Sequence, residues 1–248
     1  MMDSSSVIPP EGRSRQDAAG PAPAPSSGGG FRVLGSDDLE AATAVLARGF
    51  AQEPGNLELF PDPEIRRRLA ELVFGSQLRI WMPYATVHGV EVEGRLGGVA
   101  IWHPPHVRAR SLTGAAGSVT GLLAQAPTVA RALPHLSATL LRHGRRAPRL
   151  VRARNRAVRV ASRGPAWHLA FLATDPDFRG RGLARRLLDH VLRRCDADGL
   201  AAWLETTDPV NPPLYEHFGF ETVAHIEDAA WLPGHWVMRR EAPRDRPD

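Results

Sequence analysis

Lysine is absent from this 248-residue sequence, so all 31 basic side chains are arginines. A P-loop nucleotide site is excluded, because that loop ends in Gly-Lys-Ser/Thr and its lysine contacts the phosphates. The formal net charge is only +4, which does not by itself indicate a protein that binds nucleic acid. The positions of the arginines are therefore more informative than their number.

Cysteine is nearly absent as well, and Cys195 is the single example. One cysteine excludes an internal disulfide framework and favours a reducing, cytoplasmic location. Long apolar runs are also missing: no segment reaches the roughly 18 residues of a membrane helix. The N-terminus lacks the basic start and apolar stretch of a secretory signal. Because 43% of the residues are hydrophobic, we predict a folded core that does not enter a membrane.

The composition predicts one folded domain, from residue 31 to residue 240. Residues 1–30 are rich in Ser, Pro, Gly and Ala and end in "PAPAPSSGGG", which is typical of a disordered tail. Residues 241–248 form a short C-terminal tail. Residues 107–165 are expected to be a mostly helical insertion, interrupted by prolines and a glycine.

Apolar periodicity and turn residues predict the order of the elements. Helices are expected over about 36–50, with Ser36 as the N-cap, and over about 64–80. Residues 84–105 are typical of a hairpin with its turn near Gly94. The remaining expected elements are strands at 31–34, 166–174, 200–206 and 235–239, a segment at 219–228, a helix from 183 to about 195 and a short helix at 212–218. This order predicts an α/β fold with a mixed sheet.

The stretch "DFRGRGLARRLLDHVL" (177–192) joins a predicted strand to a predicted helix. The first amides of a helix lack intrahelical acceptors and favour an anion, while Gly180 and Gly182 permit close approach of a ligand. Arg185 and Arg186 lie in the first turn, where each cation costs roughly 0.3–1 kcal/mol. The loop therefore fits either a bound phosphate or diphosphate, or a plain turn with solvated arginines. A dinucleotide loop is excluded because Arg185 replaces its last glycine.

A second stretch, "NPPLYEHFGF" (211–220), predicts a short helix. Asn211 suits its N-cap, Pro212 its first turn and Gly219 its end. Tyr215 follows Asn211 by four residues, so both side chains are expected on one side of the helix. Taken alone, Asn211 is interpreted as a cap and Tyr215 as a half-buried aromatic residue.

Together these stretches resemble the GCN5-related N-acetyltransferase (GNAT) superfamily. Residues 179–184 are similar to its acyl-CoA loop, and residues 211–220 to the segment whose asparagine and tyrosine flank the thioester. The segments "AWHLA", "PDFRGRGLA", "LET", "NPPLYE" and "WVM" are most similar to puromycin N-acetyltransferase-like enzymes. The matching order extends over about 31–240. Residues 50–62 and 107–163, which would shape the acceptor pocket, do not match.

The resemblance implies a mixed, mostly antiparallel twisted sheet with helices on both faces and splayed central strands. It implies direct transfer of acetyl from acetyl-CoA to a primary amine of a small molecule, such as an antibiotic, without a metal. Tyr215 is the expected general acid. Glu205 is the candidate base or ammonium ligand, with a structural ion pair as the alternative. The residues expected to hold acetyl-CoA are Leu172, Ala173, Thr174, Arg179, Gly180, Arg181, Gly182, Leu183, Ala184, Arg185, Asn211 and Tyr215.

Two other reactive side chains are given structural interpretations. His168 lies in the middle of a predicted strand, where a core histidine is expected. Cys195 lies on the packed face of a predicted helix, and an acyl-cysteine route would need an exposed thiolate. Neither residue is predicted to take part in catalysis.

Arginines also recur along residues 145–163 at helical spacing. The stripe comprises Arg145, Arg149, Arg152, Arg156, Arg159 and Arg163. A solvated helix over the acceptor site is the favoured interpretation, followed by contact with acidic groups of this domain or of a second subunit. The lack of interleaved aromatics disfavours nucleic acid. The alternatives to a small-molecule enzyme, expected as a monomer or homodimer, are a protein or peptide N-acetyltransferase and a non-catalytic acyl-CoA sensor.

Overall fold

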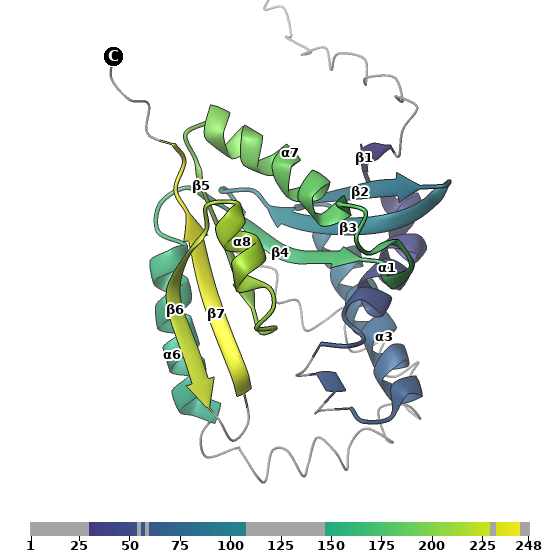
Figure 1. Ribbon diagram of the computed structural model, residues 1–248, viewed down its shortest axis with the longest axis horizontal. Coiled ribbons are helices and arrows are strands. Elements are labelled where there is room, and N and C mark those ends of the chain that lie inside the picture. Colours follow the sequence, from purple (N-terminus) through teal and green to yellow (C-terminus); the bar gives the residue numbers. More distant parts are fainter. Residues whose placement is uncertain (1–29, 54–55, 58–59, 108–146, 229–231, 244–248) are drawn as a thin grey trace, which may run out of the picture.

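The computed structural model describes residues 30–53, 56–57, 60–107, 147–228 and 232–243. In this part of the chain seven strands form one sheet in the order β1-β2-β3-β4-β5-β7-β6 (Figure 1). The strands are β1 (Phe31–Val33), β2 (Thr86–Val92), β3 (Arg95–His103), β4 (Ala166–Thr174), β5 (Ala201–Thr206), β6 (Glu221–Asp228) and β7 (Leu232–Arg240). The helices are α1 (Leu39–Gly49), α3 (Pro63–Trp81), α6 (Ala147–Ala161), α7 (Leu183–Ala197) and α8 (Pro212–His217), with short 3-10 turns at Ser36–Asp38 and Pro176–Phe178.

The central strands β4 and β5 are the only parallel neighbours among the described strands, and they pair along only part of their length. Their pairing runs from Ala166 opposite Ala201 to Leu169 opposite Leu204 and then stops. Strand β4 continues to Thr174 on β3, across a bulge that leaves Ala170 without a register partner. The expected mixed, mostly antiparallel sheet with splayed central strands is confirmed.

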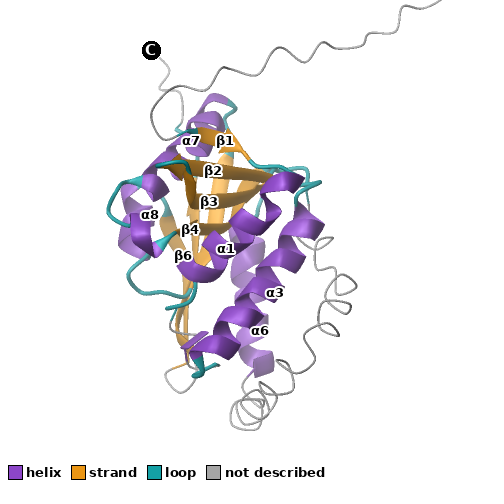
Figure 2. Ribbon diagram, turned by 90° about the vertical axis from the view of Figure 1, so that its right-hand side faces the viewer, coloured by secondary structure: helices purple, strands orange, loops and turns teal. Residues whose placement is uncertain are grey.

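Helices cover both faces of the sheet, as Figure 2 shows, and this expectation too is confirmed. On one face α7 and α8 pack on a core that includes Leu187, Leu188 and Phe220. On the other face α1 and α3 pack on a second core around Leu46 and Leu78. Helix α6 lies on that second side against β6 and β7, through a smaller cluster. The gap between β4 and β5 therefore lies between the two core layers, with α7 and α8 on one face of the sheet and α1 and α3 on the other.

The predicted hairpin has the turn that its sequence favours. Glu93 and Gly94 connect β2 to β3, and both have positive φ angles, 54° and 73°. Two successive positive φ angles characterise a two-residue type I′ turn, whose twist matches the flanking strands. The prediction of a turn near Gly94 is confirmed.

The predicted N-cap at Ser36 is wrong. Ser36 begins a 3-10 turn, and α1 starts only at Leu39. The side chain of Asp38, not that of Ser36, satisfies the exposed backbone here, because it accepts a hydrogen bond from the amide of Gly35 at 2.9 Å. Arg32 holds the same carboxylate at 2.6 Å and 2.7 Å, so Asp38 is bound by both the backbone and an arginine just before α1.

Several expectations lie outside the described residues. They are the disordered tail over 1–29, the insertion over 108–146 and most of the C-terminal tail, 244–248. Of the insertion, α6 is described, and it is helical as expected. Among the described residues, none of the helices combines the length and the apolar character needed to cross a bilayer.

Candidate functional site

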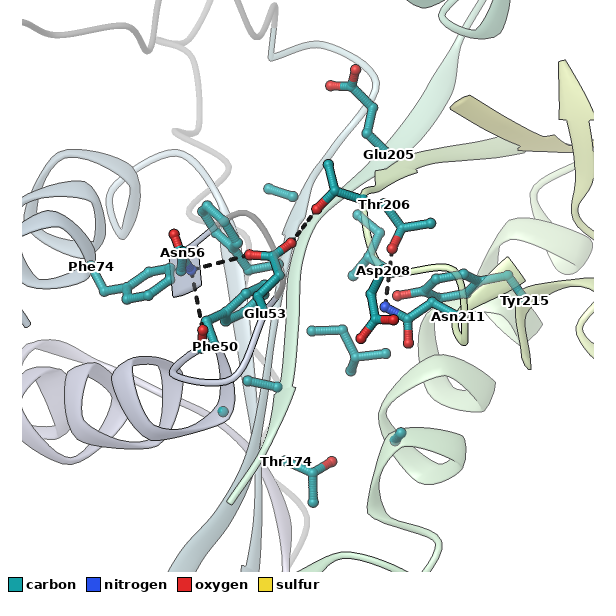
Figure 3. A pocket seen from close by; sticks show the side chains of 18 of the residues that line it. Phe50, Glu53, Asn56, Phe74, Thr174, Glu205, Thr206, Asp208, Asn211 and Tyr215 are labelled. Atoms are coloured by element: carbon teal, nitrogen blue, oxygen red, sulfur yellow. Dashed lines mark hydrogen bonds between the residues drawn. The ribbon is translucent and has the colours of Figure 1, made fainter. Parts of the chain in front are cut away.

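The splay between β4 and β5 holds a cavity of about 850 Å³. It passes from the side of α7 and α8 to the side of α1 and α3, so it has two arms. We call the part next to Thr174, Arg179, Ala184 and Asn211 the donor arm. We call the part lined by Phe50, Glu53, Phe74, Trp81 and Phe171 the acceptor arm. Figure 3 shows side chains from the two sides facing each other across the space between them.

The loop before α7 has the geometry of an anion site. Gly180 and Gly182 have φ angles of 78° and 72°, which other residues rarely adopt. Both positions have open space where a side chain would stand. The first intrahelical hydrogen bond runs from the amide of Arg186 to the carbonyl of Gly182, so the amides of residues 183–185 precede it and are available to a ligand. These features fit the diphosphate of CoA.

The arginines of this loop have different neighbours. Arg179 lines the cavity and donates a long hydrogen bond, 3.4 Å, to the carbonyl of Gly49. Arg181 pairs with Glu93 at 2.6 Å, and Arg185 with Asp189 at 3.6 Å. These pairs are half exposed, so each contributes little to stability. The guanidinium groups therefore remain free to reorient toward an anion.

The expected cofactor residues gather at the donor side, although not all of them line the cavity. Those that do are Leu172, Ala173, Thr174, Arg179, Ala184, Asn211 and Tyr215. Gly180, Arg181, Gly182 and Arg185 lie on the adjoining loop and first turn. The side chain of Leu183 is buried in the core, so only its backbone can contribute. Residues Ala170–Thr174 lie beyond the pairing with β5 and offer an unpaired strand edge to an extended ligand.

Asp175 ties the loop to the rest of the fold. Its buried carboxylate accepts hydrogen bonds from Arg48 at 2.5 Å and 3.0 Å and from the amide of Asp177 at 3.1 Å. Burial pushes the pKa of Asp175 up, but the Arg48 and Asp177 hydrogen bonds outweigh burial and leave the pKa below its usual value. The end of β4 is thereby fixed to α1.

Tyr215 lines the cavity. Its ring is buried and packs edge-on against Phe220 at 5.9 Å between centroids, and Figure 3 shows its hydroxyl pointing into the cavity. Burial, followed by the charge of Glu53, raises the pKa of Tyr215 well above its usual value. The phenol therefore stays protonated at neutral pH and can donate a hydrogen bond.

Asn211 occupies the N-cap position of α8, but its side chain makes no capping hydrogen bond. The amide nitrogen donates instead to the hydroxyl of Thr206 at 3.0 Å. The prediction that Asn211 caps through its side chain is wrong. This hydrogen bond joins the start of α8 to the end of β5 and so orients the helix that bears Tyr215.

Glu205 lines the cavity as expected, but both of its oxygens are engaged. One accepts from Arg154 at 2.5 Å and the other lies 2.9 Å from Nε2 of His235. Burial pushes the pKa of Glu205 up, and the His235 hydrogen bond and the Arg154 charge more than offset it, so the pKa lies below its usual value. This environment matches the ion-pair alternative of the sequence interpretation.

Glu53 is a candidate functional residue that the sequence did not reveal. Thr207 donates a hydrogen bond to one carboxylate oxygen, and the amide of Asn56 donates to the other at 3.2 Å. No ion pair of Glu53 occurs within the described residues. Burial raises its pKa, although the Thr207 hydrogen bond acts in the opposite direction. A carboxyl whose pKa moves toward neutrality is suited to accept a proton at physiological pH.

The structural interpretations of His168 and Cys195 fit their surroundings. The imidazole of His168 stacks on Trp203 at 3.8 Å, and burial lowers its pKa to about 3. Burial also raises the pKa of the Cys195 thiol to about 12, so this thiol is not a nucleophile at neutral pH. Within the described residues, no group of three or more His, Cys, Asp or Glu side chains is arranged to hold a metal.

Several known proteins that are similar to this chain are acetyltransferases by name. The model of the Acetyltransferase (GNAT) family matches residues 145–220. An uncharacterized N-acetyltransferase, C550.08, of Schizosaccharomyces pombe is 36% identical over 55 residues, 22% of each chain. An uncharacterized N-acetyltransferase, YhbS, of Escherichia coli K12 is 41% identical over 66 residues, 27% of this chain and 38% of the relative. The chain thus spans well under half the length of these curated relatives.

The fold is shared over a much greater length. The crystal structure of a Corynebacterium glutamicum protein described as histone acetyltransferase HPA2 and related acetyltransferase superposes with a TM-score of 0.58. The superposition covers 87% of this chain and 98% of that one, at 21% sequence identity, and at that identity it shows the fold alone. The family match over residues 145–220 and this shared fold together support a GNAT-superfamily acetyltransferase fold for the chain.

Proposed function

We propose that the chain is an acetyl-CoA-dependent N-acetyltransferase that acts on a primary amine of a small molecule. The observation that carries this proposal is the continuous cavity through the splayed sheet, which brings the loop before α7, Tyr215 and Glu53 to one space. Acetyl-CoA supplies an acetyl thioester. The amides before α7 and the arginines around them would hold its diphosphate. The open edge of β4 would hold its extended arm.

Glu53 is the proposed base. An amine attacks only as the free base, so a group near its nitrogen must take a proton from the ammonium form. The raised pKa of Glu53 favours this transfer, and the Thr207 and Asn56 hydrogen bonds hold the carboxylate in place. Glu205 is less suited, because Arg154 and His235 already stabilise its ionised form. We assign it the role of fixing β5 to α6 and β7.

Tyr215 is the proposed donor to the leaving sulfur. As the new amide N–C bond forms, the C–S bond breaks and its electron pair stays on sulfur, which takes up a proton. Starting from ammonium, the products are the acetamide, the thiol of CoA and one released proton. Burial makes Tyr215 a weaker acid than a free phenol. Its O–H therefore first stabilises the thiolate as a hydrogen-bond donor. Once Tyr215 has passed its proton to the sulfur, it regains a proton from solvent.

The substitution Tyr215→Phe tests this assignment. The ring and its packing on Phe220 are retained, so the affinity for acetyl-CoA should stay unchanged in calorimetry. Loss of the proton donor should lower kcat by about 100-fold or more, measured as release of free thiol. Full turnover in the Phe variant would exclude Tyr215 from the mechanism. Binding of acetyl-CoA without any acetylation in the wild type would instead favour the non-catalytic sensor.

The acceptor is proposed to be a small molecule because it must reach Glu53 through the acceptor arm, between α1, α3 and the sheet. Amino-bearing antibiotics belong to this class, and an amine panel that includes aminonucleosides and aminoglycosides tests them directly. The structural neighbour of Corynebacterium glutamicum carries a histone acetyltransferase name, so a basic peptide belongs in the same panel. Faster acetylation of the peptide than of every small amine would overturn the small-molecule proposal.

A further inference from the structure

The acceptor arm has an aromatic wall. Phe171, on β4, lies at its centre, with Phe50, Phe74 and Trp81 around it at ring-centroid distances of 5.6, 5.2 and 5.5 Å. All four rings line the cavity. Val73 of α3 adds a side chain that is 47% exposed. Phe50, Trp81 and Phe171 are only partly buried, and partly buried rings inside a cavity are suited to pack against a flat apolar ligand.

The wall carries no net positive charge of its own. His103 stands edge-on to Trp81 at 4.9 Å between centroids, and burial lowers its pKa to about 4, so the imidazole is neutral at pH 7. His168 is neutral for the same reason. Arg154 is the cation that lines this side, and it is paired with Glu205. A ligand therefore meets rings and neutral imidazoles along this wall.

Negative charge lies at the inner end of the arm instead. Glu53 and Asp208 both line the cavity, and they are close enough that the charge of Asp208 helps to raise the pKa of Glu53. Figure 3 shows Glu53 and Asp208 near the splay and Phe50 and Phe74 on the outer side. The arm thus offers one place for a cation and, in the same cavity, a surface for an apolar ring.

We infer that the acceptor is an aromatic monoamine, in which a primary amine is separated by one or a few carbon atoms from an aromatic ring. The ammonium group would lie at Glu53 and the ring against Phe171. A polyamine fits less well, because its further cations would lose water against the aromatic wall, where the described residues offer them no carboxylate. This inference rests on the proposed acetyltransferase function and names the substrate class of the same site.

The test compares three amines as acceptors for the full chain with acetyl-CoA. They are 2-phenylethylamine, 2-cyclohexylethylamine, which has the same carbon skeleton without the aromatic ring, and spermidine. We expect kcat/KM for 2-phenylethylamine to exceed that for spermidine by about tenfold or more. It should also exceed that for the cyclohexyl amine. Equal or faster acetylation of spermidine would overturn the inference and leave the acetyltransferase function standing. Equal rates for the two ring amines would show that the acceptor need not be aromatic.

A matched pair of variants locates the ring. Phe171→Leu should raise KM for 2-phenylethylamine about tenfold while kcat changes little, because only binding of the ring is lost. Phe31→Leu, on β1 and outside the cavity, should change neither constant. An unchanged KM in a folded Phe171→Leu protein would overturn the placement.

Calorimetry of the wild type separates this inference from the function on which it rests. In the presence of CoA, 2-phenylethylamine should bind and spermidine should not. Binding without acetylation would overturn the proposed function but keep the ligand class. The absence of both binding and acetylation of the aromatic amine would overturn the ligand class.

Discussion

Two glutamates that line the same cavity have opposite electrostatic environments. Glu53 is partly buried with neutral hydrogen-bond donors, and its pKa is raised. Glu205 is buried with Arg154 and His235, and its pKa is lowered. When two titratable groups in one site are shifted apart in this way, their roles differ. Here one carboxylate is available to exchange a proton, and the other is a fixed charge.

The different roles predict opposite effects on stability when each carboxyl is replaced by an amide. The raised pKa of Glu53 means that the folded state resists its ionisation, so stability falls as pH rises above the ordinary carboxyl range. Glu53→Gln should therefore raise the melting temperature at pH 7. The lowered pKa of Glu205 gives stability that is present above its unfolded pKa and lost at lower pH, so Glu205→Gln should lower the melting temperature at pH 7.

Thermal melts of both variants from pH 3 to pH 8 make the comparison. Near pH 3 the wild-type Glu53 and its amide should differ little, because the carboxyl is then protonated in both the folded and unfolded states. A Glu53→Gln protein that is less stable than the wild type at pH 7 would show that the carboxylate is held by a cation, contrary to the environment described above.

Thr207 permits a test of Glu53 as the base in the working enzyme. The Thr207 hydrogen bond lowers the pKa of Glu53, so Thr207→Val should raise that pKa further. The rate falls as pH falls through the pKa of the base, and the acid limb of kcat/KM should therefore move to higher pH. Thr43→Val, whose hydroxyl bonds a carbonyl within α1, should leave the limb unchanged. An unmoved limb in Thr207→Val would assign it to another group.

Sequence patterns revealed Tyr215 but not Glu53, for a physical reason. Tyr215 belongs to a compact motif in which the helix start, Asn211 and the aromatic residue occur within five positions. Glu53 lies in a loop without periodicity, and it becomes functional through Thr207, which is 154 residues away. The partners of Glu205, Arg154 and His235, lie 51 and 30 residues away in sequence. A local pattern identifies a carboxylate, whereas its pKa depends on groups that only the fold brings near.

At the scale of elements, α7 agrees well with the helix that the sequence predicts. Its apolar face at Leu187, Leu188 and Val191 is buried as the periodicity predicted. Strand β4 was predicted to the residue, over Ala166–Thr174, because Gly164 and Pro165 precede it and Pro176 follows it closely. The error at Ser36 arises because Asp38, which bonds the backbone at the start of this segment, also pairs with Arg32. That ion pair cannot be predicted from helix signals alone.

The two ends of α7 provide a controlled test of the donor arm. Gly182 precedes the helix and Gly199 follows it, both with positive φ (72° and 63°) and both with open space around the missing side chain. A glutamate at either position should cost about 1–2 kcal/mol in backbone strain. Only Gly182→Glu places a negative charge at the anion site, so it alone should weaken CoA binding in calorimetry, by about 100-fold or more. Equal weakening by Gly199→Glu would show that strain is responsible, and unchanged binding by Gly182→Glu would place the cofactor elsewhere.

The stripe of arginines on α6 is an element-scale feature with a plain explanation. Its described members, Arg149, Arg152, Arg156, Arg159 and Arg163, are all exposed. Their helix is held by the opposite face, where Ala157 and Ala161 are buried against β5 and β7. Solvation of the stripe agrees with the favoured sequence interpretation. The arginine of α6 that lines the cavity is Arg154, which the spacing did not single out.

At the scale of the whole molecule, the function depends on a gap in the sheet. The sheet separates two cores, and the cavity crosses it only where β4 and β5 stop pairing after Leu169 and Leu204. The order of elements in the sequence predicted the mixed sheet, and the resemblance to a known superfamily implied its splayed strands. Neither could predict which loops meet in the gap, because residues 50–53 and 205–211 come together only after both layers have packed.

Asp175 joins the two layers, so its replacement should affect the whole molecule. The carboxylate stands at the end of β4, beside the donor loop, and is held by Arg48 of α1, on the acceptor side. Asp175→Asn keeps the shape but removes the charge. Because the Arg48 side chain is 46% exposed, we expect a modest loss of about 1–2 kcal/mol at pH 7, measured by urea unfolding.

The pH dependence of that loss follows from the sign of the shift. The pKa of Asp175 is lowered in the folded protein, so its stabilising contribution is complete above the ordinary carboxyl pKa and disappears as pH falls through the folded value. The difference between wild type and Asp175→Asn should therefore shrink toward zero at low pH. CoA affinity should fall along with stability, because the loop that carries Gly180 and Gly182 begins at this carboxylate. A variant that loses stability but binds CoA as tightly as the wild type would show that the loop holds its shape without the tie to α1.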